Sequence, residues 1–184
     1  YTMSGGASLW LMDMVTIKKD PESGNDFAFG KELNLIDFFF KYGVRINPNL
    51  VKDLYSAPIL LASGSERESN YNRYPWFYSP LTSSANKHPI VTNIEAVKFD
   101  YASGIDTLPN KIKKTILLSS SPISKIVGLP IEIDITKEIN KNLKSVNEGP
   151  PASFIAGEIP LAVLLEGSFP SAFTNRVKPF TLEN

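Results

Sequence analysis

The sequence predicts an α/β fold built on a mostly parallel central sheet. Residues 7–13 (ASLWLMD) carry four consecutive apolar side chains without alternation, which is typical of a strand covered on both faces in a parallel sheet. Residues 34–46 read as a helix, a glycine and a short strand, a sequence that fits an α/β unit. Alternating apolar and polar residues at 97–102 and 131–135 predict additional antiparallel strands.

The helix within residues 31–53 has the clearest start and stop signals in the chain. Asn34 stands at an N-cap position with Asp37 three residues later, and Gly43 can adopt the left-handed conformation that ends helices. Apolar side chains recur between these signals at helical spacing, at Leu35, Phe38, Phe39 and Tyr42. We therefore expect this face, with Val44 and Ile46 beyond it, to pack on a core.

The first half of the chain contains further punctuated segments. Residues 16–30 are polar and rich in turn formers, so we expect an exposed loop there. Residues 57–62 (APILLA) predict a strand, and the low hydrophobicity of residues 63–73 predicts a mobile segment. The aromatic string at residues 74–78 fits either a sugar- or peptide-binding platform or a strand covering the edge of the core, and we favour the strand.

The second half of the chain ends in two more apolar runs. Residues 114–119 predict a buried strand that opens into a serine-rich turn, and residues 159–166 predict the last strong strand. Between them, residues 139–147 predict a poor short helix or a loop, followed by a break at residues 149–151 (GPP).

Composition narrows the function classes. The 184 residues suit a single domain over residues 1–184, and 19 basic residues balance 19 acidic ones. Zero net charge argues against nucleic-acid binding and against a polybasic membrane patch. The chain has no cysteine and one histidine, so a metal site would depend on carboxylates, and none has calcium-loop spacing. We expect no metal and no cofactor.

One run of nucleophilic side chains follows a predicted strand. Ser119, Ser120 and Ser121 stand at the carboxyl end of residues 114–119, where α/β proteins usually bind ligands. A serine-type hydrolase would use Ser120 or Ser121 with His88 as its base. However, the G-x-S-x-G elbow is absent, and nothing in the sequence brings His88 near these serines. A histidine followed by proline also commonly shapes a turn, and we favour that interpretation.

Two aspartates are candidates for the residue that would orient His88. Asp13 ends the first predicted strand, and Asp106 is the alternative. We favour Asp13 as a loop cap over a catalytic carboxylate. The candidate ligand- or partner-contact residues are therefore Asp13, His88 and the three serines, and we predict no catalytic, cofactor-binding or metal-binding residue.

Several phrases of the sequence, taken in order, match one family. They are residues 4–6 with 9–13, 33–37 with 41–47, 49–53, 86–91, 114–121 and 162–167. Together they resemble the GldG family of gliding-motility-associated ABC transporter components of Bacteroidetes, within the wider group of auxiliary ABC-transport extracytoplasmic domains. The resemblance spans nearly the whole chain, and its most specific part is residues 42–53.

The resemblance implies an α/β domain similar to flavodoxin-like or glutamine-amidotransferase-like folds. It implies a non-catalytic, substrate-binding-like or scaffolding role at the extracytoplasmic (periplasmic) face of the cell inner membrane, with an ABC permease subunit and an ATP-binding subunit as partners. The chain opens on Tyr1 and is expected to be an incomplete domain, a fragment of a longer protein anchored by membrane segments outside residues 1–184. A serine-type hydrolase and a small-solute receptor stay open as alternatives.

Overall fold

The fold is antiparallel, and the predicted mostly parallel α/β architecture is wrong. The computed structural model describes residues 1–65, 68–82, 84 and 87–174. Every strand pairing among these residues runs antiparallel, and the strands form five small sheets rather than one central sheet. The apolar run at residues 7–13 that suggested a parallel sheet forms no strand, and only two α-helices occur in the described residues.

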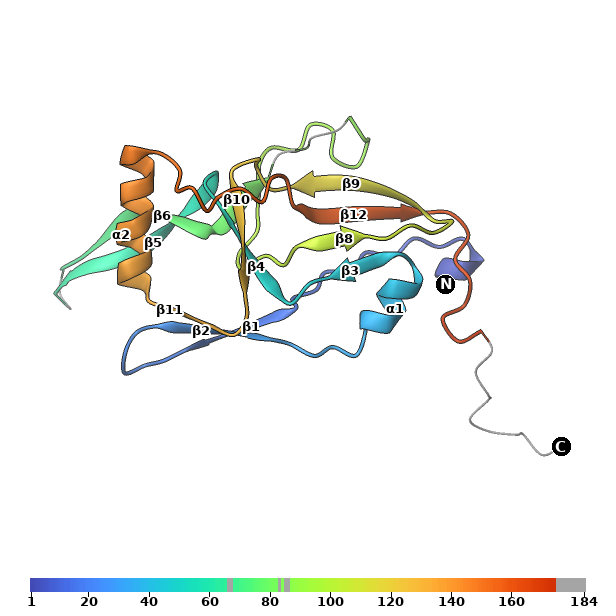
Figure 1. Cartoon of the computed structure of the whole chain (residues 1–184), viewed down its shortest axis with the longest axis horizontal. Coiled ribbons are helices and arrows are strands. Elements are labelled where there is room, and N and C mark those ends of the chain that lie inside the picture. The colour runs from blue at the N-terminus through green and yellow to red at the C-terminus, as the bar shows by residue number, and fades with distance from the viewer. Residues whose placement is uncertain (66–67, 83, 85–86, 175–184) are drawn as a thin grey trace.

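The elements follow one another with short connections (Figure 1). The helices are α1 (Ile36–Lys41) and α2 (Ile135–Glu148), and a 3-10 turn, η1 (Thr2–Ser4), precedes them. The strands are β1 (Val15–Lys19), β2 (Asp26–Gly30), β3 (Val44–Ile46), β4 (Asn49–Asp53), β5 (Ser56–Ser65), β6 (Glu68–Thr82), β7 (Val97–Lys98), β8 (Ile105–Thr107), β9 (Lys113–Ser119), β10 (Ser124–Gly128), β11 (Ile131–Ile133) and β12 (Pro160–Glu166).

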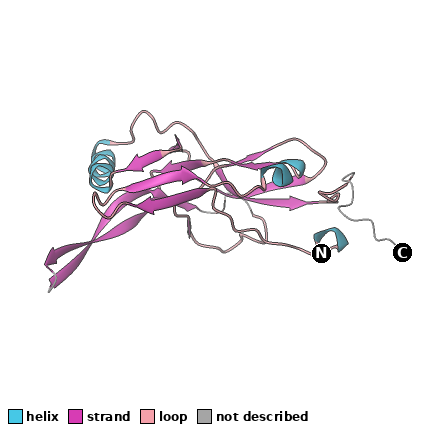
Figure 2. Ribbon diagram, turned by 90° about the horizontal axis from the view of Figure 1, so that it is seen from below, coloured by secondary structure: helices cyan, strands magenta, loops and turns pink. Residues whose placement is uncertain are grey.

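The five sheets combine segments that are distant in sequence. Their strand orders are β1-β2-β11, β10-β4, β12-β9, β3-β8 and β5-β6-β7. Figure 1 shows α2 crossing beside the β5–β6 ribbon at one end of the molecule and α1 beside β3 at the other end. The ribbon extends beyond the body of the molecule, which Figure 2 shows from below.

Strand β4 lies between two hydrophobic clusters, which explains its burial. Leu50 and Val51 are both fully buried, and adjacent residues of a strand face opposite sides. Leu50 joins a cluster with Val15, Ala28, Trp76, Tyr78, Ile133 and Ile139. Val51 joins a second cluster with Ala102, Ile159 and Leu161. Strand β4 is therefore covered on both faces without belonging to a parallel sheet.

Residues 7–30 differ from their predicted structure in both parts. Residues 7–13 form no strand, and Leu9 and Leu11 are exposed. Residues 16–30 form no open loop, because β1 and β2 pair as a hairpin with Lys19 opposite Asp26. The predicted turn formers make the turn of this hairpin, where the Asp20 carboxylate accepts hydrogen bonds from the Glu22 amide and the Ser23 hydroxyl.

Helix α1 is shorter and more peripheral than its sequence signals suggested. Its N-cap is Leu35 rather than Asn34, and no side chain caps it. The predicted C-terminal signal is confirmed, because Gly43 has a φ of 81°. None of the six helical residues is buried, and Ile36 and Phe40 are exposed.

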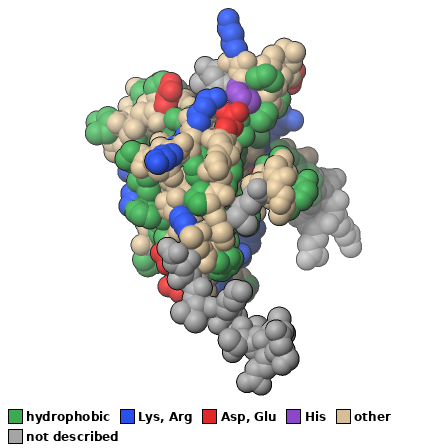
Figure 3. Space-filling model, turned by 90° about the vertical axis from the view of Figure 1, so that its right-hand side faces the viewer, with side chains coloured by type: hydrophobic (Ala, Val, Ile, Leu, Met, Phe, Trp, Pro, Cys, Tyr) green, Lys and Arg blue, Asp and Glu red, His purple; other side chains and the backbone are tan. Residues whose placement is uncertain are grey.

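The apolar face of α1 joins an aromatic cluster instead of either hydrophobic cluster. Phe38 contacts the rings of Trp10 and Tyr42 at centroid distances of 5.5 and 5.0 Å, and Tyr42 contacts Phe169 at 5.6 Å. The predicted core residues Tyr42 and Val44 are buried, whereas Phe38 and Ile46 are half-buried. Figure 3 shows the end of the molecule that carries α1, where hydrophobic side chains alternate with polar ones.

Helix α2 replaces the predicted poor helix or loop with four turns of regular structure. The Asp134 carboxylate caps it by accepting the Lys137 amide at 2.9 Å. Its buried side chains are Ile139, Asn142 and Ser145, three residues apart, and two of these are polar. Its two polar members are hydrogen-bonded, because Asn142 donates to the Pro75 carbonyl and Ser145 donates to the Lys141 carbonyl.

The remaining strand predictions are largely confirmed. Strands occur at residues 57–62, 114–119 and 160–166, although all of them pair antiparallel. The strands predicted at residues 97–102 and 131–135 are shorter, β7 at Val97–Lys98 and β11 at Ile131–Ile133. The aromatic string lies in β6 and covers the core, as favoured, with Trp76, Phe77 and Tyr78 buried. Residues 63–65 and 68–73 of the predicted mobile segment belong to β5 and β6, and residues 66 and 67 lie outside the described part.

Candidate functional site

The serine turn between β9 and β10 is held by one buried carboxylate. Asp53 ends β4 and is fully buried. Its carboxylate accepts hydrogen bonds from the Ser121 amide and the Ser121 hydroxyl, both at 2.6 Å, and from the Tyr55 amide at 2.9 Å. The antiparallel pairing of β4 with β10, which sets Asp53 opposite Ser124, brings the turn to this carboxylate.

The other serines attach the turn to the segment that leads into β12. The Ser120 hydroxyl accepts the Ile159 amide at 2.8 Å, and the Ser120 amide donates to the Ile159 carbonyl at 2.9 Å. The Ser124 hydroxyl donates to the Gly157 carbonyl. Ser120 and Ser124 are buried, so these bonds satisfy polar groups that water does not reach.

The hydrogen bonds of the turn show how each serine hydroxyl is used. A serine nucleophile needs a base within hydrogen-bond reach, about 2.6–3.2 Å. The Ser121 hydroxyl accepts the Ile123 amide and donates to the Asp53 carboxylate, which also accepts the Ser121 and Tyr55 amides. The Ser120 hydroxyl lies between backbone groups. The turn is a junction that joins β4, β9, β10 and the residues before β12.

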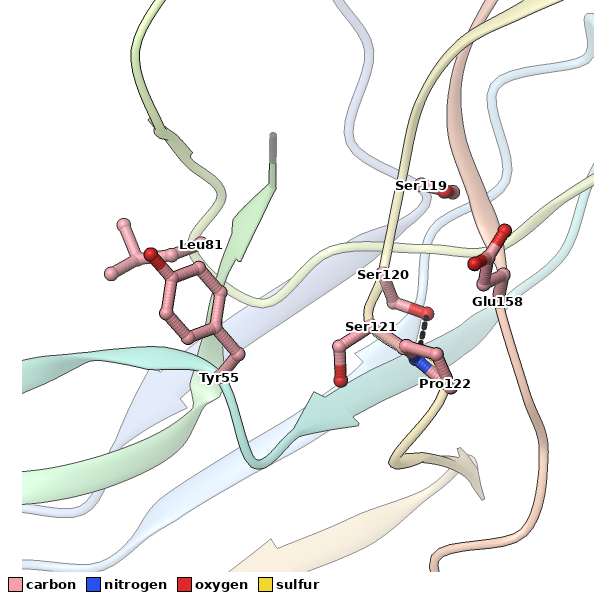
Figure 4. Close-up of a pocket in the computed structure, with 7 residues that line it drawn as sticks. All are labelled: Tyr55, Leu81, Ser119, Ser120, Ser121, Pro122 and Glu158. Atoms are coloured by element: carbon pink, nitrogen blue, oxygen red, sulfur yellow. Dashed lines mark hydrogen bonds between the residues drawn. The ribbon is translucent and has the colours of Figure 1, made fainter. Parts of the chain in front are cut away.

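A shallow hollow lies beside this junction. Its volume is about 160 Å³, below the roughly 300–1,000 Å³ of ordinary ligand pockets. Tyr55 and Leu81 line one side, and the serine turn with Pro122 and Glu158 lines the other (Figure 4). The hollow brings together the three predicted serines, but neither Asp13 nor His88 lines it.

His88 lies toward the end of the β9–β12 strand pair that is opposite the serine turn. Its Nδ1 accepts the Ile90 amide at 3.3 Å and its carbonyl accepts the Val91 amide, so it shapes a turn. The pKa of Glu166 is lowered chiefly by its bond to Lys113, with a further contribution from His88, so His88 lies near that carboxylate.

The register of the β9–β12 strand pair gives the distance between its two ends. Lys113 pairs with Glu166 at one end, and Ser119 pairs with Pro160 at the other end. About 20 Å of extended strand lies between the two ends. His88, near Glu166, therefore lies toward the end away from Ser119.

The two candidate orienting aspartates are also apart from the serine turn. Asp13 is exposed in the segment before β1. Asp106 in β8 binds Arg45, which stands opposite it on β3, at 2.5 Å. Hydrogen bonds from Arg45 and then Asn47 hold the pKa of Asp106 below its usual value, so this carboxylate stays ionised in its pair. Arg45, Asn47 and Asp53 thus all contribute contacts between strands or between a strand and a turn.

A second polar feature is the ion pair that joins β4 to α2. Lys52 binds Glu138, and their side chains are only 10% and 12% exposed. Burial lowers the pKa of Lys52 despite Glu138, and the Lys52 ammonium lies 4.6 Å from the Tyr78 ring centroid. Burial acts to raise the pKa of Glu138, but Lys52 and Lys141 outweigh it, so this pKa lies below its usual value.

Sequence reasoning missed the residues on which the junction depends. Asp53, Tyr55 and Glu158 were not candidates, although an aspartate that accepts the amide two residues later has a recognisable turn pattern. The described residues contain no group of three or more side chains placed to hold a metal ion. None of the described helices is long and apolar enough to cross a membrane.

Fold and site together define an antiparallel β protein in which the Asp53 carboxylate joins a serine-rich turn to β4. Residues 1–183 match the family model described as an ABC-type uncharacterized transport system. The chain belongs to this family and is an auxiliary component of an ABC-type transport system. No curated protein and no solved structure matches the chain.

Proposed function

We propose that the chain is a non-catalytic, extracytoplasmic scaffolding domain of an ABC-type transport complex associated with gliding motility. It belongs to a longer membrane-anchored protein at the periplasmic face of the cell inner membrane, and its partners are the permease and ATP-binding subunits. Membership of the auxiliary-component family supports the transport role. The family resemblance of residues 42–53 supports the link to gliding.

The serine junction is the observation that carries the non-catalytic part of this proposal. The strongest catalytic candidates, Ser120 and Ser121, use their hydroxyls in bonds to Asp53 and to backbone groups. The one histidine of the chain, His88, lies toward the end of the β9–β12 strand pair away from Ser119. A chain with this arrangement acts through the surfaces that its strands present.

Co-purification tests the partnership. The intact natural protein, tagged and extracted from membranes in mild detergent, should recover the permease and ATP-binding subunits of one transporter. The matched control lacks residues 1–174 but keeps the rest of the protein, and it should lose both subunits. Equal recovery by the control would contradict the proposal. Protease protection in spheroplasts should place this segment outside the cytoplasmic membrane, and cells carrying the deletion should stop gliding.

Turnover measurements test the absence of catalysis. The protein, His88→Ala and Ser120→Ala are assayed on a panel of esters, amides and glycosides. We expect no turnover above the uncatalysed rate for any of them, and a stability change only for Ser120→Ala, because its hydroxyl bonds buried backbone groups. Turnover that both variants abolish would show a hydrolase instead.

A further inference from the structure

Strand β5 leaves one edge open along the projecting ribbon. It lies at the end of the strand order β5-β6-β7, so among the described residues β6 is its only strand partner. Figures 1 and 2 show the ribbon reaching away from the other sheets. An open edge presents unpaired amide and carbonyl groups to which another strand can bind.

The register identifies the backbone groups that point outward. The Pro75 carbonyl of β6 accepts the side-chain amide of Asn142 on α2 at 3.0 Å, so it points away from β5. Pro58 stands opposite Pro75. Two facing residues of an antiparallel pair direct their backbone groups either both toward each other or both away from each other, so the Pro58 carbonyl points away from β6. Two residues further along the strand, Leu60 also directs its amide and carbonyl outward.

The composition of β5 differs from that of the other strands. No charged residue occurs between Ser56 and Ser65, whereas each other strand in the described part of the chain contains at least one. Native proteins commonly protect open edges with charges, lysine above all. Leu60 is nevertheless 57% exposed on this edge, although Pro58 gives partial protection by lacking an amide proton.

We propose that β5 pairs antiparallel with β5 of a second copy of this chain about a two-fold axis at Leu60. An uncharged strand sets no like charges against its own copy, and the alternation of its outward groups is complementary to itself. The two Leu60 side chains then lie side by side and cover each other.

The two-fold symmetry explains why this pairing closes at two copies. Both copies use the same edge of β5, so a dimer leaves no β5 edge for a third copy. Part of β6 is also covered, because helix α2 packs against it and Asn142 binds the outward carbonyl of Pro75.

Sedimentation of the intact protein over a range of concentrations tests the dimer. We expect a mass of two copies, and Leu60→Pro should reduce it to one copy. Proline removes an amide proton that the ribbon does not use, so circular dichroism should stay unchanged. The matched control is Ile126→Lys on β10, an apolar side chain of similar exposure (49%) away from the ribbon, and it should remain dimeric.

A cross-link gives a second readout should Leu60→Pro disturb folding. The chain has no cysteine, so Leu60→Cys introduces one thiol per copy. Paired residues at the axis have Cα atoms about 5.5 Å apart, within disulfide reach. Mild oxidation should give a covalent dimer, and Ile126→Cys should give none.

Several outcomes would overturn the proposal. A monomer at every concentration, a Leu60→Pro variant that stays dimeric, or assemblies larger than two copies would each do so. The proposal would also be overturned if the protein is a monomer and the Leu60→Pro variant no longer co-purifies with the permease subunit. That result would assign the β5 edge to the permease.

Discussion

At the scale of single residues, buried carboxylates make the strand junctions. Asp53 is fully buried and accepts three hydrogen bonds, and its loss would deprive the Ser121 and Tyr55 amides of this acceptor. A second buried carboxylate, Asp26, accepts the Tyr101 hydroxyl at 2.7 Å. Burial, followed by the bond to Asp26, raises the pKa of Tyr101, so its hydroxyl stays protonated and donates.

The first stability prediction concerns Asp53. Replacing it by alanine should lower the free energy of unfolding by about 3 kcal/mol, because three hydrogen bonds to a fully buried side chain are lost. Urea denaturation followed by circular dichroism measures the change. The control is Asp106→Ala, which breaks an exposed pair with Arg45 and should cost less than about 1 kcal/mol. Equal losses of unfolding free energy in the two variants would show that Asp53 does not hold the junction together.

At the scale of elements, the turn after α1 requires a glycine. Gly43 has a φ of 81°, and a Cβ there would lie 2.5 Å from Asn110 Nδ2 and 2.6 Å from Lys114 Cε. Two independent costs, backbone strain and crowding, therefore act at this position. The crowded atoms belong to side chains that can move, so the backbone conformation is the firmer of the two constraints.

The second stability prediction follows from this turn. Gly43→Ala should destabilise the protein by about 1 kcal/mol or more, because alanine disfavours positive φ. Thermal unfolding measures the loss. Gly128→Ala in β10 is the matched control, since no atom lies within 4 Å of its added Cβ and its φ is not positive. A stability equal to that of Gly128→Ala would contradict the requirement.

At the scale of the whole molecule, the Lys52–Glu138 pair ties α2 to the central strand. Lys52 shares β4 with Leu50 and Val51, and Glu138 shares α2 with Ile139, so the pair connects elements that also meet in the core. The pKa of Glu138 is lowered in the folded state. Its ionised form therefore contributes stability above the unfolded value of 4.5, and this contribution is lost as the pH falls through the lower folded pKa.

The third prediction is an acid-dependent difference between two proteins. Glu138→Gln should cost about 3 kcal/mol at pH 7, because Lys52 is left buried without its counterion. The cost should shrink as the pH falls below 4.5, where Glu138 is protonated in the unfolded chain. The difference in denaturant midpoint between the two proteins, followed from about pH 2 to about pH 7, measures how this cost changes with pH. The double variant Lys52→Met with Glu138→Gln should recover most of the loss, and a constant cost across pH would contradict the assignment.

The sequence by itself determined the positions of most strands and several ends of elements. The apolar runs at β5, β9 and β12 form strands because each places apolar side chains on a partly buried surface. The end of α1 at Gly43 follows from local backbone preference. Resemblance of short phrases also identified the wider family, which the match over residues 1–183 confirms.

Only the tertiary structure decided which strands pair and what the polar residues do. Burial of β4 on both faces arises from two clusters of distant residues, so an apolar run carries no information about parallel or antiparallel neighbours. Helix α2 buries Asn142 because the Pro75 carbonyl is there to accept its amide. The serine turn became a junction because Asp53, distant in sequence, accepts its hydrogen bonds. Strands β9 and β12 are separated in sequence by β10, β11 and α2, so their pairing depends on contacts between distant segments.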